Sequence, residues 1–147
     1  MADLWYAYSN IMKDVTKKWV AFARGDLEAA ELQFQHGGTR GSAYQIAVFH
    51  CHQAIEKILK AHIVEQDKEV KKSHDLTQLR ALTGLSMPDH LVECIDNLQP
   101  HYLIPRYPDL PFKPSFTFTY NRANTKIILN QTQELLLWLE QKLTQKK

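Results

Sequence analysis

Residues 47–61, with the sequence AVFHCHQAIEKILKA, lie near the middle of the chain and contain its most regular hydrophobic pattern. Apolar residues recur there at steps of three and four, as they do on one face of an amphipathic helix. The pattern continues in both directions, so we predict a helix from about residue 42 to 66. Its buried stripe is expected to consist of Tyr44, Ala47, Val48, Cys51, Ile55, Ile58 and His62.

A second face of this predicted helix is polar. His50, Gln53, Lys57 and Lys60 follow each other at steps of three and four, so they form a row along the helix axis. Lysine offers a point charge to a phosphate, and an imidazole can donate a hydrogen bond to one. The row therefore suggests phosphate or nucleotide binding. The alternative is a solvated face whose lysines pair with nearby acids such as Glu56.

Helices are also predicted on both sides of this segment. One runs from about residue 14 to 35 and ends at Gly37, because glycine tolerates the left-handed conformation that often follows a helix. Two short helices begin after Ser73 and Ser86, which are expected to cap them. The last helix, from about 121 to 143, is apolar on more than one face. Such a helix is either central in a bundle or covered by a partner subunit.

Residues 100–120 interrupt the helices. Prolines at 100, 105, 108, 111 and 114 exclude a regular helix there, and interleaved aromatic residues favour an ordered loop that packs on the helices. Pro105 and Pro108 flank Arg106 and Tyr107, and each proline biases the residue before it to an extended shape. We expect this to hold the guanidinium and the tyrosine ring in limited orientations. A fixed arginine suits a phosphate, a tyrosine can stack on a base, and Asp109 can orient a polar group. The alternative is an Arg106–Asp109 pair that only ties down the loop.

Composition narrows the function classes. With 147 residues, the chain suits one domain. A net charge of +2 is too small to indicate nucleic-acid binding, which stays open. No apolar run is long enough for a membrane span and no secretory signal is evident, so a cytoplasmic location is expected. We expect no metal site and no cofactor, because zinc-type ligand spacing and glycine-rich phosphate loops are absent from the sequence.

Three strings in this order resemble the HEPN family. They are residues 47–61, Ser73-His74-Asp75-Leu76 followed by Leu79, and Arg106-Tyr107-Pro108-Asp109. The likeness covers about residues 15–143, the core of a single domain spanning 1–147. It implies an all-α, up-and-down antiparallel bundle of four to five helices, with the proline-rich loop before the last one. It also implies a homodimer and binding of a nucleotide. Many prokaryotic members pair with a minimal nucleotidyltransferase as toxin and antitoxin.

The chain departs from the ribonucleases of this family in one respect. Those members carry an arginine, four to six other residues, and then a histidine, which moves protons while the arginine stabilises charge on the phosphate. No arginine of this chain has a histidine at that distance; the five are Arg24, Arg40, Arg80, Arg106 and Arg122. We therefore assign no catalytic residue.

The sequence thus favours a HEPN-type binding module for a nucleotide, a nucleotidyltransferase partner, or both. Its predicted site comprises His50, Gln53, Lys57, Lys60, Arg106, Tyr107 and Asp109. This prediction requires Arg106 to lie close to Lys57. One alternative is a divergent metal-independent ribonuclease toxin with His50 or His74 as the base. Another is an interaction domain without a ligand.

Overall fold

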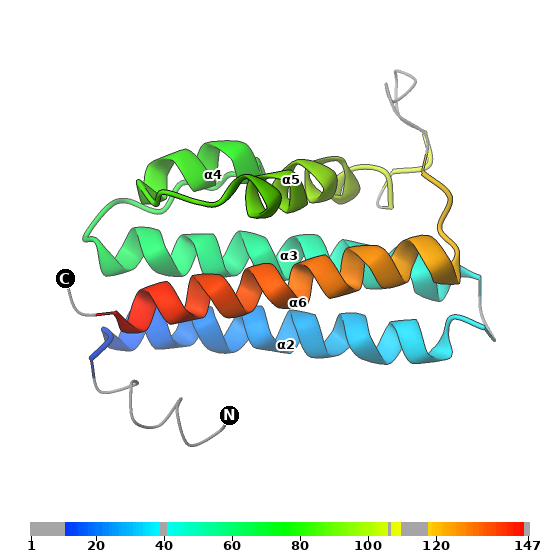
Figure 1. Cartoon of the computed structure of the whole chain (residues 1–147), viewed down its shortest axis with the longest axis horizontal. Helices are drawn as coiled ribbons and strands as arrows, with labels where there is room; N and C mark the ends of the chain where they lie inside the picture. Colours follow the sequence, from blue (N-terminus) through cyan, green and yellow to red (C-terminus); the bar gives the residue numbers. More distant parts are fainter. Residues whose placement is uncertain (1–10, 39–40, 106, 110–117, 146–147) are drawn as a thin grey trace.

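The computed structural model describes residues 11–38, 41–105, 107–109 and 118–145, and they form helices without a strand. The elements are α2 (Asp14–His36), α3 (Ser42–Glu65), α4 (Leu76–Thr83), α5 (Asp89–Leu98), the 3-10 helix η1 (Gln99–Tyr102) and α6 (Arg122–Thr144). Figure 1 shows α2, α3 and α6 as three long neighbouring helices, with α4 and α5 along one side of α3. Helices α2, α3, α5 and α6 alternate in direction, which confirms the predicted all-α bundle.

Helix α3 lies at the centre of this bundle. It packs against α2, α4, α5, α6 and η1. The predicted stripe is buried, but so are residues on other faces, including His52, Glu56 and Lys60. The imidazole of His62 lies 2.7 Å from the carbonyl oxygen of Leu139 and so joins α3 to α6. The helix that carries the polar row is therefore enclosed from several sides.

Helix α6 is less enclosed than its sequence suggests. It packs on α3, α2 and α5, yet Ile127 and Leu137 remain 57% and 40% exposed. Of the two alternatives predicted for it, the central position is taken by α3, which packs against more elements. The exposed pair leaves open the alternative that a partner subunit covers this face.

Three predicted helix signals have a different physical basis. Gly37 is right-handed, with φ −58°, and glycine is needed because a Cβ would collide with the ring of Tyr44. The carboxylate of Asp75, not the hydroxyl of Ser73, caps α4 by accepting from the amides of Thr77 and Gln78. Helix α5 has Pro88 at its N-cap and no side-chain cap, so the prediction for Ser86 was also wrong.

No helix in the described part of the chain is long and apolar enough to cross a membrane.

Candidate functional site

The polar row of α3 is divided between two carboxylates. The first is Asp26 of α2, whose side chain is 11% exposed. His50 Nδ1 lies 2.9 Å from one of its oxygens, and the ammonium group of Lys57 pairs with the other. Burial alone would raise the pKa of Asp26, but the hydrogen bonds from His50 and Lys57 outweigh it and lower the pKa. These three residues are called the Asp26 cluster below.

The second carboxylate is that of Glu56, on α3 itself. Lys60 Nζ donates to one oxygen at 2.7 Å, and Gln53 Nε2 donates to the other at 3.4 Å. His74 Nδ1 lies 3.0 Å from the oxygen that Gln53 contacts. Burial again favours a raised pKa, but the bonds from Lys60 and His74 hold the pKa of Glu56 below its ordinary value. Glu56, Gln53, Lys60 and His74 form the Glu56 cluster.

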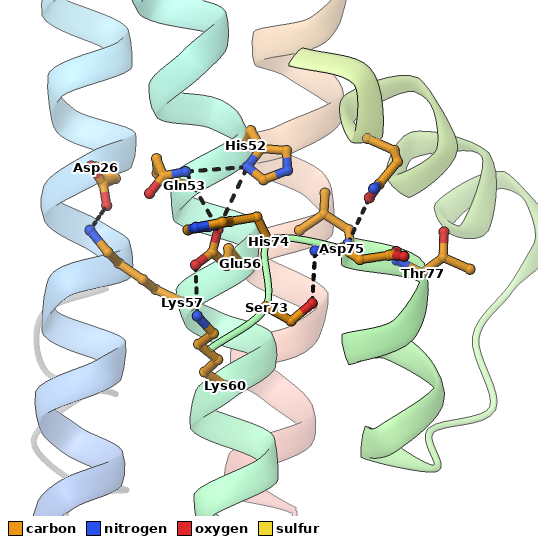
Figure 2. A network of polar contacts seen from close by, with 12 residues as sticks. Asp26, His52, Gln53, Glu56, Lys57, Lys60, Ser73, His74, Asp75 and Thr77 are labelled. Atoms are coloured by element: carbon orange, nitrogen blue, oxygen red, sulfur yellow. Dashed lines mark hydrogen bonds and ion pairs between the residues drawn. The ribbon is translucent and has the colours of Figure 1, made fainter. Parts of the chain in front are cut away.

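His74 is the exposed member of that cluster. Figure 2 shows the segment before α4 carrying it across to α3, where it meets Glu56. The adjoining turn is held by the Asp75 cap and by Ser73 Oγ, which accepts from the Asp75 amide at 3.1 Å. The imidazole is 48% exposed although its Glu56 partner is 5% exposed. A carboxylate can only accept, so Nδ1 carries the hydrogen and Nε2 is left for a ligand.

An aromatic layer covers one side of the Glu56 cluster. The ring of Tyr102 stacks on His74, with centroids 5.4 Å apart and planes 26° apart. The same ring packs on His52 at 5.4 Å. Tyr102 ends η1, so this contact fixes where the following loop leaves the helices. The chain thus departs toward residues 103–105 directly beside His74.

His52 is a neutral, buried member of this layer. Its side chain is fully buried, and burial lowers its pKa to about 4. Gln53 Nε2 donates to His52 Nδ1 at 3.3 Å. The other ring nitrogen, His52 Nε2, has no hydrogen-bond partner in the described part of the chain. His52 Nδ1 and Glu56 Oε2 are 3.9 Å apart, which is too far for a hydrogen bond. His52 therefore supports the Tyr102 ring and offers no charge to a ligand.

The loop returns to the bundle at another buried histidine. His101 Nδ1 lies 2.8 Å from the Tyr120 hydroxyl, and the Phe118 ring meets the His101 ring edge-on at 4.7 Å.

Of the predicted loop residues, Tyr107 is 45% exposed and Asp109 is also exposed. Arg106 lies outside the described residues, so its approach to Lys57 remains a prediction.

The structure therefore brings the seven predicted site residues together only in part. His50 and Lys57 share Asp26, while Gln53 and Lys60 share Glu56. Both lysines of the row are ion-paired, as the alternative prediction expected: Lys60 pairs with Glu56 and Lys57 pairs with Asp26. Sequence reasoning missed the roles of Asp26 and Tyr102, which lie on other elements. His74, which the sequence offered as part of a family string and as a possible base, is the exposed member of the Glu56 cluster.

The chemistry open to this site is hydrogen bonding and proton transfer. An imidazole oriented by a carboxylate can accept a proton at Nε2 when neutral, or donate to an anion when protonated. No group of three histidine, cysteine or acidic side chains within the described ranges is arranged to hold a metal ion. The side chains that could contact a ligand at this site come from α3, from the segment before α4 and from the described part of the loop after η1.

Comparison with known proteins places these features in a family context. A model of the HEPN domain matches residues 16–142. The structure of TT1696 from Thermus thermophilus superposes with a TM-score of 0.72 at 27% identity, covering 88% of this chain and 99% of that one. ST0689, described as an archaeal HEPN homologue, gives a TM-score of 0.65 at 24% identity, with 87% and 97% covered. No curated protein matches the chain.

Proposed function

The chain belongs to the HEPN domain family, and we propose that it is a binding module of that family which holds the phosphate of a nucleotide beside His74. The observation that carries the proposal is the contact between a half-exposed imidazole and a buried carboxylate. Glu56 orients His74 through Nδ1, and Tyr102 stacks on it, so the other ring nitrogen is presented in a fixed direction.

The predicted loop residues supply the second half of this proposal. Tyr102 anchors the loop beside His74, and Arg106 follows it by four residues. A guanidinium brought to the same phosphate as His74 would make charge-assisted, bidentate hydrogen bonds. In this proposal the half-exposed ring of Tyr107 would stack on a base, and Asp109 would orient a polar group.

Calorimetric titration of the full chain with nucleoside mono-, di- and triphosphates and with inorganic pyrophosphate tests the proposal. His74→Gln and Arg106→Ala should each weaken binding about tenfold or more, the value of a charge-assisted hydrogen bond, with nearly unchanged melting temperatures. His90→Gln is the matched control, since His90 lies 3.0 Å from Glu134 in an exposed pair between α5 and α6. Equal binding by all four proteins would refute the proposal.

A ribonuclease activity is the second candidate, and the His74–Glu56 pair favours it specifically. The pair has the form of a general base, with a carboxylate fixing the tautomer and Nε2 left free of that contact. Incubation of RNA with purified protein in a metal chelator tests this candidate. Cleavage that is lost in His74→Gln and retained in His90→Gln would support it, and intact RNA would exclude it.

Partnership is a further part of the proposal, in line with the family resemblance. A homodimer would cover exposed apolar side chains such as Phe22, which is 66% exposed on α2, or Leu137, which is 40% exposed on α6. A minimal nucleotidyltransferase is the expected protein partner, as in a toxin–antitoxin pair. Light scattering of the purified chain tests the first point, and co-purification with a nucleotidyltransferase encoded beside it tests the second.

A further inference from the structure

A groove separate from the His74 site lies between α5, η1 and the first half of α6. Its volume is about 470 Å³, which suits a ligand the size of a nucleoside. Four of its lining side chains are amides or acids, namely Asp96, Asn97, Asn124 and Gln131, and the others are His101 and apolar residues such as Phe118 and Ile127. We propose that this groove binds a purine nucleoside through its base, with guanine preferred.

The walls of the groove come from matching positions on two helices. Asn124, Ile127 and Gln131 are spaced by three and four on α6, so they share one face. Asp96 and Asn97 lie opposite, at the end of α5. Asn97 Nδ2 reaches Gln131 Oε1 at 3.4 Å, a long hydrogen bond that spans the groove. Such a weak contact is readily exchanged for a bond to a ligand.

The polarity of the lining selects an uncharged, planar ligand. The lining contains no lysine or arginine among the described residues. Its one histidine, His101, is buried, and burial lowers its pKa to about 4, so it is neutral at physiological pH. Carboxamides carry donors and acceptors on one edge, as nucleobases do. The apolar side chains of Phe118 and Ile127 suit the flat faces of a base.

Asp96 supplies the preference for guanine. A carboxylate only accepts hydrogen bonds and can accept two in parallel. Guanine presents an imino N–H and an amino N–H side by side on one edge, whereas adenine has an acceptor in place of the imino group. Guanosine should therefore bind about tenfold more tightly than adenosine, the value of one charge-assisted hydrogen bond.

Nucleosides without phosphate are the probes, because they lack the group that the His74 site is proposed to hold. We expect guanosine to shift the side-chain amide signals of Asn97 and Gln131 in nitrogen-15 correlation spectra of the full chain. Asp96→Asn should weaken guanosine about tenfold, and Asn97→Ala a few-fold. Asn130→Ala is the matched control, since Asn130 is an exposed asparagine of α6 outside the lining and should leave binding unchanged.

Each outcome bears on the groove alone. The inference is overturned if guanosine at about 1 mM, a concentration within its solubility that detects affinity near millimolar, shifts none of these signals. It is also overturned if the shifts persist unchanged in Asp96→Asn. Pyrophosphate titrations of the same samples report on His74, so loss of nucleoside binding with retained pyrophosphate binding would remove the groove and leave the proposed function intact.

Discussion

Two buried histidines predict that the fold loses stability in weak acid. His52 and His101 are 0% and 1% exposed, and burial lowers the pKa of each from 6.5 to about 4. An unfolded chain binds a proton at each of these positions near pH 6.5, whereas the folded chain does so only near pH 4. The unfolded state therefore binds more protons within this window, and the free energy of unfolding falls as the pH falls through it.

The size of the effect follows from the shifts. A difference of about 2.5 pH units corresponds to roughly 3 kcal/mol for each histidine at about 1.36 kcal/mol per unit. Two such groups remove up to about 6 kcal/mol, a large part of the roughly 5–15 kcal/mol by which domains are normally stable. Below about pH 4 both states are protonated at these residues and their contribution no longer changes.

Urea unfolding between about pH 7.5 and 5.0 measures this slope. The wild-type free energy of unfolding should fall by up to about 2.7 kcal/mol per pH unit from these two groups. His52→Gln and His101→Gln should each remove about half of that dependence, because glutamine does not titrate. Each variant will also be less stable at neutral pH. The quantity to compare is therefore the slope of the free energy of unfolding against pH, not its absolute value. Wild-type slopes in both variants would refute the reasoning.

Three further variants test the packing around the site by thermal or urea unfolding. Glu56→Gln should lower the free energy of unfolding by about 3 kcal/mol, because it leaves the 8%-exposed ammonium group of Lys60 without its carboxylate. The control Glu134→Gln, in an exposed pair, should change it by less than about 0.5 kcal/mol. Gly25→Ala should raise the melting temperature by about 3 °C, since Gly25 is mid-helix with open space around it, and a decrease would contradict this reading. Asp75→Ala should cost about 1 kcal/mol through loss of the α4 cap, and an unchanged stability would show that the cap contributes nothing.

Long periodic segments were predictable from sequence because many residues report on the same helix. The predicted segment 14–35 corresponds to Asp14–His36, and the predicted segment 42–66 corresponds to Ser42–Glu65. Single-residue signals were less reliable. Ser73 and Asp75 are both good caps, and the choice between them depends on which residue adopts the extended backbone before α4.

The site was predictable only where its residues share a helix. The row from His50 to Lys60 follows from helical spacing, and its pairing with Glu56 lies within that helix. Asp26 could not be assigned to the row, since its contact depends on the register between α2 and α3. Tyr102 likewise reaches His52 and His74 only because η1 packs on α3. Tertiary contacts of this kind have no local sequence signal.

These contacts change which groups can attract a phosphate. Lys57 and Lys60 are the obvious cations of the row, but each is balanced by a carboxylate with which it is already in contact. An incoming anion would have to compete with Asp26 or Glu56 for them and would meet the repulsion of the same carboxylates. His74 is tied to Glu56 through one nitrogen and is half exposed. Attraction of a phosphate to this surface should therefore depend on His74 and Arg106 more than on the lysines that first draw attention in the sequence.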